Sequence, residues 1–382
     1  MSARRLLRLA AVSDAVYPWH RGGKELRYHE LLGRLPERGV EVDLYTMRWW
    51  DGDAPAAPVR HHAISPRLQM YRDGRRTIGQ GVRFALATLR LLRAPRPDVV
   101  EADHMPYLQL FPLAVVCRLR RVPLVVTWHE VWGGAYWRRY MGRAGGTVAA
   151  VVERLSLRLP HRIVAVSEPT AARLRELGVP AERLVVIEAG IRREAIRAQP
   201  PADGAPDVLS LGRLIGHKRT DLAIRAIALL PGVCLGVVGS GEEREALEAL
   251  AASLGVADRV AFLGAVATDE EVYALLRGAR VLAAPTEREG FGIAVAEALS
   301  AGLPVVTSDH PDNAARVLVE PGVTGDVVAA GDEAALAAAL ARWLDRADGR
   351  ADREARFDAT LAHLAWDATA DRYAALLHEV AR

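Results

Sequence analysis

Short apolar segments alternate with longer helical segments along this 382-residue chain, and the alternation constrains its fold more than any other feature. The apolar segments are rich in Val, Leu and Ile, as buried parallel strands are. We expect strands at residues 6–12, 40–46, 98–101, 124–128, 163–166, 184–187, 208–211, 233–238, 260–263, 281–284, 305–307 and 326–328. Strands that alternate with helices in this way predict an α/β protein with parallel sheets.

The pattern is interrupted at residues 197–206, where Pro and Gly are frequent and no periodicity is left. Such a stretch is typical of a linker. It predicts two doubly wound, Rossmann-like domains, residues 1–200 and 201–360. Ligands of such domains bind at the carboxyl ends of the strands, so we expect the two sites to face each other across a cleft.

Charge divides at the same place. Residues 1–200 hold 33 Lys and Arg against 19 Asp and Glu, a net charge of +14, whereas residues 201–382 have a net charge of −11. The basic first domain indicates an anionic partner.

Residues 289–297 read Glu-Gly-Phe-Gly-Ile-Ala-Val-Ala-Glu and lie where a strand should turn into a helix. The backbone N–H groups of Phe291, Gly292 and Ile293 would point out of the helix N-terminus and favour a diphosphate. Glu289 in the loop and Glu297 inside the helix would then accept hydrogen bonds from hydroxyls on either side of it. A nucleotide sugar has both sets of hydroxyls, although a glutamate pair alone fits a solvated surface helix.

Only two of the 50 basic residues are lysines, and each lies between a strand and a helix. Arg213 and Lys218 follow the strand at 208–211, where a forked guanidinium and a compact ammonium suit a diphosphate. Lys24 follows Gly22 and Gly23, and these glycines would allow close backbone approach to a ligand. For Lys24, a solvated position in the first turn of a helix is an equal alternative.

Several classes of protein are disfavoured by the sequence. No apolar run reaches the length of a membrane span, and the N-terminus enters a strand without a long apolar region, which predicts a cytoplasmic protein. Residues 13–24 lack the Gly-x-Gly-x-x-Gly motif of nicotinamide-dependent oxidoreductases. We expect Cys117 and Cys234 to be small buried apolar residues. Residues 51–53, Asp-Gly-Asp, indicate a turn, and no metal or other cofactor is expected.

In order along the chain, the motifs are Gly22-Gly23, His129, Gly212-Arg213 with Lys218, Gly239-Ser-Gly241, and Glu289 to Glu297 followed by Gly302-Leu-Pro-Val-Val306. Together they resemble the retaining nucleotide-sugar glycosyltransferases of family 4 (glycosyl transferases group 1), which have the GT-B fold. The resemblance covers nearly the whole chain. Residues 366–373 resemble the last helix of that fold, so residues 361–382 are expected to cross back onto the first domain.

The resemblance implies a role for each of these residues. Glu289 would bind hydroxyls of the donor sugar, Glu297 the ribose, and Arg213 with Lys218 the leaving diphosphate in place of a metal ion. His129 would lie beside the sugar, with Gly22 and Gly23 closing over the phosphate. Gly241, Val266, Gly290, Phe291, Gly292 and Ile293 complete the expected donor-binding set.

The implied reaction moves a hexosyl unit from a UDP- or GDP-sugar to a hydroxyl, with retention and without a covalent nucleophile. Glu101, Asp103 and Glu130 are alternative bases near the acceptor. The chain departs from the family at residues 188–192, Glu-Ala-Gly-Ile-Arg, where Asn-Gly-Val/Ile-Asp is common, and in the loop 308–313.

The sequence leaves the acceptor open. Residues 128–143 interleave aromatic residues with arginines, which suits an anionic membrane surface at the inner face of the cell membrane, with Trp132, Trp137, Arg138, Arg139 and Arg143 as the contact. The acceptor would then belong to glycan, glycolipid or polysaccharide synthesis. The same residues suit a soluble acceptor that stacks on aromatic rings. A non-catalytic GT-B module or a sugar-nucleotide epimerase would also fit the fold, and no nucleic-acid-binding motif is present.

Overall fold

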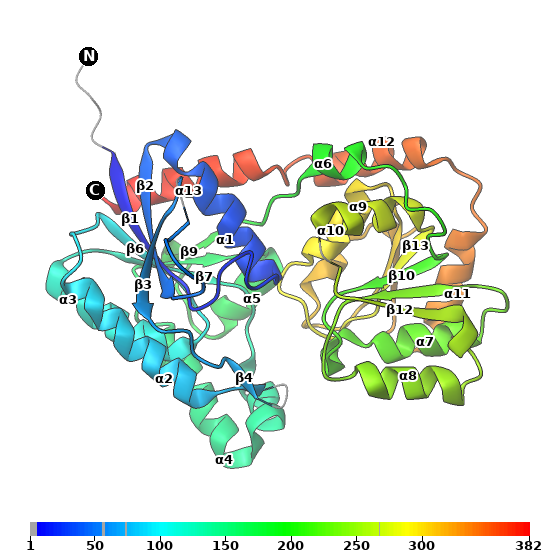
Figure 1. Ribbon diagram of the computed structural model, residues 1–382, viewed down its shortest axis with the longest axis horizontal. Helices are drawn as coiled ribbons and strands as arrows, with labels where there is room; N and C mark the ends of the chain where they lie inside the picture. Colours follow the sequence, from blue (N-terminus) through cyan, green and yellow to red (C-terminus); the bar gives the residue numbers. More distant parts are fainter. Residues whose placement is uncertain (1–5, 56–57, 73–74, 267) are drawn as a thin grey trace. The chain divides into compact units, whose positions relative to one another are not determined.

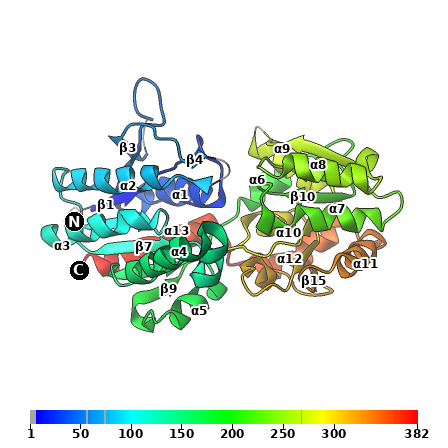
Figure 2. The ribbon, with the colours of Figure 1, turned by 90° about the horizontal axis from the view of Figure 1, so that it is seen from below.

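The computed structural model describes residues 6–55, 58–72, 75–266 and 268–382. The chain forms two compact units (Figure 1). Unit 1 ends at Gly190 and resumes at Trp366, and unit 2 comprises Ile191–Ala365. In each unit helices surround a parallel sheet (Figure 2).

The sheet of unit 1 has seven strands in the order β3-β2-β1-β6-β7-β8-β9, and every neighbouring pair is parallel. The strands are β1 (Leu7–Val12), β2 (Val40–Met47), β3 (Arg60–Ser65), β6 (Val99–Asp103), β7 (Leu124–Trp128), β8 (Arg162–Ala165) and β9 (Leu184–Val186). The chain builds outward from β1 to β3 and then returns to the other side of β1 with β6. The strand order therefore reverses between β1 and β6, which is where an open α/β sheet binds its ligand.

Unit 2 repeats the arrangement with six parallel strands in the order β12-β11-β10-β13-β14-β15. Its strands are β10 (Val208–Leu211), β11 (Leu235–Val238), β12 (Val260–Gly264), β13 (Val281–Ala284), β14 (Val305–Ser308) and β15 (Gly325–Val328). Here the order reverses between β10 and β13. Two further short strands, β4 (Tyr71–Arg72) and β5 (Arg75–Arg76), form an antiparallel pair in unit 1.

Both faces of each sheet are covered. Consecutive residues of one strand point to opposite faces, yet Val125 and Val126 are both fully buried, as are Val208 and Leu209. The covering helices are α1 (Gly23–Arg34), α2 (Ile78–Ala87), α3 (Leu110–Arg120), α4 (Gly133–Ser156), α5 (Glu168–Glu176), α6 (Arg193–Ala198), α7 (Thr220–Ala228), α8 (Arg244–Ser253), α9 (Asp269–Gly278), α10 (Ile293–Ser300), α11 (Glu333–Leu344), α12 (Arg350–Leu361) and α13 (Trp366–Val380). Within the described residues, no helix has the length and apolar content needed to span a bilayer.

The C-terminal helix α13 belongs to unit 1, as the resemblance implied, and lies against α1. Tyr373 of α13 is fully buried, with its hydroxyl 3.4 Å from Thr127 Oγ1. At the surface, Arg38 donates to Asp371 at 2.6 Å and to Asp367 at 3.0 Å. This combination of buried and surface contacts explains why a helix at the end of the chain completes the first unit.

All twelve expected strands are present, but the sequence missed the short strands β4 and β5 and also the longer strand β3. This strand pairs only with β2 at the edge of its sheet, and only its last two residues are buried, so its residues show no apolar run. The expected linker at 197–206 was wrong at its start, because Arg197 lies in α6 and bonds Asp358 within unit 2. The units divide instead at Gly190 and Ile191. Cys117 is buried as expected, whereas Cys234 is exposed directly before β11.

Candidate active site

In unit 2, the expected donor residues gather at the carboxyl ends of β10 and β13, where the strand order reverses. Lys218 Nζ forms an ion pair with Glu289 Oε2, and the two side chains are 23% and 25% exposed. Gly212 and Gly292 have φ of 149° and 98°, values that favour glycine, and allow tight turns on either side of this pair. The structure therefore brings together two residues that are 71 positions apart.

A pocket lies over this ion pair and is lined in part by Arg213, Lys218, Glu289, Gly292 and Thr286. The Arg213 side chain is exposed, and it forms no hydrogen bond or ion pair with the residues that the structure describes. Its guanidinium is therefore available to an anion that enters the pocket. Burial, Lys218 and Arg213 lower the pKa of the neighbouring His217 to about 3, so this imidazole stays neutral beside the two cations.

The other expected donor residues do not line this pocket. Phe291 is buried, and Glu297 is 9% exposed in the second turn of α10. Ile293 begins that helix, directly after Gly292 at its N-cap. Gly290 is half-buried beside Glu289, and Val266 is half-buried after β12.

Gly239 and Gly241 have a packing role that the sequence did not predict. A Cβ at Gly239 would collide with Gly212 O, and one at Gly241 with Leu214 O. The two glycines therefore let the loop after β11 pack against the loop after β10, which carries Arg213.

The loop 308–313 supports Glu289, and sequence reasoning missed this. Glu289 N donates to Asp312 O at 3.0 Å, and Ala314 N donates to Glu289 O at 2.8 Å. Asn313 is fully buried, and its amide donates to Thr307 Oγ1 and Ser308 O. The only sequence signal was the unusual composition of this loop.

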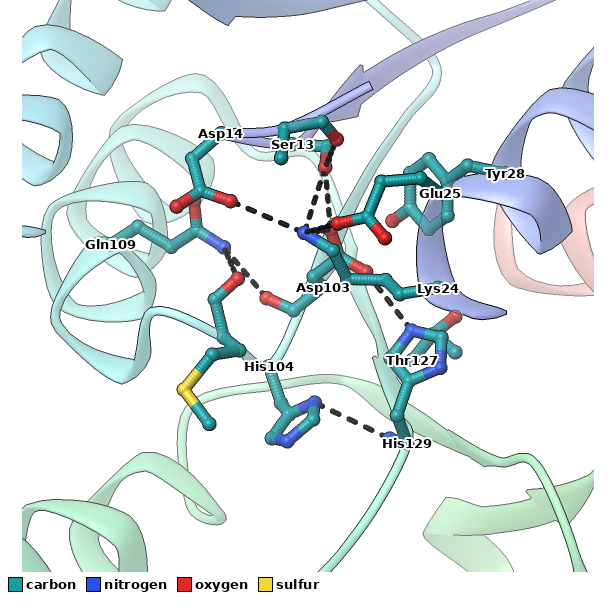
Figure 3. Close-up of polar contacts among 12 residues, drawn as sticks. Ser13, Asp14, Lys24, Glu25, Tyr28, Asp103, His104, Gln109, Thr127 and His129 are labelled. Atoms are coloured by element: carbon teal, nitrogen blue, oxygen red, sulfur yellow. Dashed lines mark hydrogen bonds and ion pairs between the residues drawn. The ribbon is translucent and has the colours of Figure 1, made fainter. Parts of the chain in front are cut away.

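In unit 1, His129 lies just after β7, and its Nε2 is 3.0 Å from Asp103 Oδ1 (Figure 3). Asp103 ends β6 next to the point where the strand order reverses, and its side chain is fully buried. His129 N donates to His104 Nδ1 at 3.3 Å. Two consecutive residues at the end of β6 thus hold both the ring and the backbone of His129.

The structure gives Lys24 a definite position. Its ammonium is 3.2 Å from Asp14 Oδ1 and 3.2 Å from Asp103 Oδ2, and its side chain is only 14% exposed. Gly22 is the N-cap of α1 and Gly23 its first residue, so both glycines lie next to this charge cluster. The alternative of a solvated Lys24 is wrong.

The charge cluster of Lys24, Arg76, Asp14 and Asp103 keeps its two carboxylates ionised. Burial would raise the pKa of Asp103, but Lys24 and His129 outweigh it and hold that pKa below its usual range. Burial opposes ionisation of Asp14 in the same way, and Arg76 with Lys24 holds its pKa well below the usual range. Burial lowers the pKa of His129 despite Asp103, so its imidazole is neutral near pH 7.

Of the alternative bases, Asp103 bonds His129, whereas Glu101 is enclosed. Glu101 is 1% exposed and accepts hydrogen bonds from Tyr28 and from Thr127 Oγ1. Glu101 therefore has no path to a substrate. The third candidate, Glu130, accepts a hydrogen bond from Trp132 Nε1 at 2.7 Å.

The aromatic and basic segment differs from the expected membrane contact at Trp137, whereas Arg138, Arg139 and Arg143 are exposed. Trp137 is 7% exposed, and its indole N–H donates to Glu153 Oε2 at 2.8 Å, so it is not free to enter a membrane. Glu153 also accepts from Tyr107 Oη and from the backbone N–H of Trp132. This buried carboxylate, which the sequence did not single out, organises the aromatic residues at the start of α4.

Comparison with known proteins identifies the class. Residues 192–357 match the family described as glycosyl transferases group 1, and residues 21–195 match glycosyltransferase family 4. The chain is 30% identical to D-inositol 3-phosphate glycosyltransferase of Nocardia farcinica, over 92% of this chain and 83% of the relative. It is 29% identical to the Thermobispora bispora protein of the same name, over 98% and 95% of the two chains.

Among solved structures, Anabaena HepE in complex with UDP and glucose superposes with a TM-score of 0.75 at 18% identity, over 98% of this chain and 100% of that one. That likeness shows the GT-B fold. The fold and the family matches together define a GT-B transferase. The chain belongs to the group 1, family 4 glycosyltransferases.

Proposed function

We propose that this enzyme transfers a hexosyl unit, with retention and without a metal ion, from a UDP- or GDP-sugar to a hydroxyl acceptor. The observation that supports this donor is the Lys218–Glu289 pair at the reversal between β10 and β13, with Arg213 exposed beside it. Two cations and one carboxylate match a donor that has a diphosphate next to a polyhydroxylated ring. HepE, which shares the fold, binds UDP and glucose.

In the proposed reaction Arg213 and Lys218 stabilise the charge that develops on the leaving diphosphate. Glu289 leaves its pairing with Lys218 to accept hydrogen bonds from the sugar, and Glu297 accepts from the ribose. The acceptor oxygen bonds to the anomeric carbon on the face from which the diphosphate leaves, the bond from that carbon to the phosphate oxygen breaks, and the departing phosphate oxygen takes the proton of the acceptor hydroxyl. The protein therefore supplies positioning and charge stabilisation.

The first test measures nucleotide binding by thermal shift with UDP, GDP, ADP and CMP. A nucleotide at about a hundred times its dissociation constant stabilises a protein by about 2.7 kcal/mol. We expect UDP or GDP to raise the melting temperature, with no requirement for Mg²⁺. The anomeric configuration of the transferred sugar, read by NMR of the product, tests retention.

We further propose that the acceptor is presented at an anionic membrane surface, through a face formed by α2, α3 and the 3₁₀ turn Thr88–Leu92 that packs against both. Of the contact expected from the sequence, only Trp137 is buried, whereas Arg138, Arg139 and Arg143 are exposed and could add to this surface. Residues 78–97 contain four arginines, all exposed, and no Asp or Glu: Arg83, Arg90, Arg93 and Arg96. The exposed large apolar side chains of these three elements are Ile78, Val82, Leu86, Leu89, Leu92, Val115 and Leu119. Exposed apolar side chains among arginines suit anionic lipid headgroups.

Co-sedimentation with vesicles that contain an acidic lipid tests the membrane face. Leu86 and Leu119 are 60% and 68% exposed, so we expect Leu86→Ser with Leu119→Ser to reduce binding several-fold, and high salt to reduce it further. Val317 of unit 2 is 56% exposed, and Val317→Ser is the matched control that should leave binding unchanged. An enzyme that stays in the supernatant at low salt would point to a soluble acceptor.

A further inference from the structure

Lys24 belongs to the turn that carries Gly22 and Gly23, but its ammonium points into unit 1 and not toward solvent (Figure 3). It lies between two fully buried carboxylates, Asp14 and Asp103, and 3.3 Å from Ser13 Oγ. Asp14 has a second cation of its own, because Arg76 Nη1 is 2.7 Å from Asp14 Oδ2. Asp103 depends on Lys24 for its permanent positive neighbour, since the other side chains that its carboxylate contacts among the described residues are Ser13 and His129.

Asp103 uses its two oxygens differently. Oδ2 contacts Lys24 and Ser13, and Oδ1 contacts His129 Nε2. An ionised carboxylate is only an acceptor, so Nε2 must carry the proton in the neutral imidazole. Nδ1 of His129 is then left with a lone pair.

We propose that Lys24 is a positioning residue that keeps Asp103 ionised, so that Asp103 holds His129 as the neutral Nε2–H tautomer whose Nδ1 accepts a hydrogen bond from a substrate hydroxyl. The hydrogen bond from a substrate hydroxyl rests on the proposed function, whereas the series of contacts from Lys24 through Asp103 to His129 does not. Neither the residue type nor the spacing of Lys24 had decided between a solvated and a functional position.

The charged groups around His129 determine whether its protonation moves to higher or lower pH when the Lys24 charge is removed. Asp103 and His104 contact His129 from the end of β6, the charges of Lys24 and Arg27 on α1 act on its ring, and Glu101 of β6 is coupled to Asp103. Lys24 and Arg27 disfavour the imidazolium, and Asp103 favours it. Without the Lys24 charge, the Asp103–His129 pair must take up a proton at higher pH.

Nitrogen-15 NMR of histidine-labelled enzyme tests this without a substrate, with His129→Gln to assign the signal. In the parent we expect the Nε2–H tautomer at pH 7. In Lys24→Met, which keeps the length of the side chain and removes its charge, protonation of the pair should move up by at least about one pH unit, and Lys24→Arg should reverse part of that shift. An Nδ1–H tautomer in the parent, or an unchanged titration in Lys24→Met, would overturn the proposal.

Asp43 provides a matched control in the same sheet. It also bonds a histidine and a basic residue, with Oδ1 2.7 Å from His62 Nε2 and 2.8 Å from Arg60 Nε. It lies on β2, which β1 separates from the β6 strand of Asp103. Asp43→Asn should leave the His129 signals and turnover unchanged, and a His129 shift in this variant would show that any lost carboxylate disturbs the ring.

Kinetics supply the second readout. In Lys24→Met we expect kcat at pH 6 to fall about a hundredfold, with a smaller loss at pH 8 and with KM for the donor within about threefold of the parent. Equal losses at both pH values would indicate a merely structural role.

If the parent itself turns over no nucleotide sugar, the proposed function fails while the NMR titration still decides the role of Lys24. If Lys24→Met does not fold, the parent tautomer and Asp103→Asn, which should lose the tautomer preference, keep the proposal testable.

Discussion

Glu101 and Asp103 lie two residues apart on β6, so both carboxylates project from the same face of the strand. Their pKa values nevertheless shift in opposite directions. Lys24 and His129 hold the pKa of Asp103 low against the effect of burial. Burial raises the pKa of Glu101 to about 7, and the neighbouring Asp103 adds to this rise. One strand thus presents an ionised carboxylate to the site and a protonatable one to the core.

Glu101 should make stability depend on pH. Its folded pKa is raised above the unfolded value, so its contribution is fully present below about pH 4.5 and is lost as pH rises through about 7. As the pH rises from 5 to 8, we expect the parent to lose on the order of 2 kcal/mol of unfolding free energy that Glu101→Gln, which cannot ionise, keeps. Urea unfolding at the two pH values measures this, and an identical difference at both would contradict it.

Lys218→Ala should lower turnover of the nucleotide sugar by at least about a hundredfold, because a cation that stabilises the leaving diphosphate contributes several kcal/mol in the transition state. Arg280→Ala is the control. Arg280 is an exposed cation of the same unit that pairs with Asp207 and lies before β13, at the opposite end of that strand from Glu289. Full activity in a folded Lys218→Ala enzyme would remove the proposed role.

Glu297→Gln should mainly weaken nucleotide binding, by about tenfold, because the proposed partner of this carboxylate is the ribose and not the reacting carbon. Isothermal titration with the nucleoside diphosphate measures the affinity, and kcat at saturating donor should change far less. A variant that binds as tightly as the parent but turns over slowly would place Glu297 at the chemistry instead.

Glu153→Gln should destabilise unit 1 by about 2–4 kcal/mol. The carboxylate is 2% exposed and accepts from Tyr107, Trp137 and two backbone N–H groups, so an amide would direct its own N–H group at a donor. Chemical unfolding, followed by tryptophan fluorescence, measures the loss. A change below about 0.5 kcal/mol would show that the start of α4 does not depend on this residue.

Much of the fold could be predicted because its signals are local. Strands buried on both faces must be apolar at every position, so β7 and β10 are visible as continuous runs. The edge strand β3 lacks that requirement and was missed. The glycines and glutamates of residues 289–297 were equally visible, because a strand-to-helix turn that holds an anion needs particular residues at fixed spacing.

The sequence by itself therefore determined the α/β class, the family and the residues around the expected donor pocket. Only the tertiary structure decided which side chains meet: Lys24 with Asp103, 79 positions away, and Lys218 with Glu289, 71 positions away. It also decided that Trp137 and Glu101 are buried and that Cys234 is exposed. The physical reason is that strand and helix patterns depend on neighbours in sequence, whereas burial, ionisation and tautomer depend on neighbours in space that the strand order of the sheet brings together.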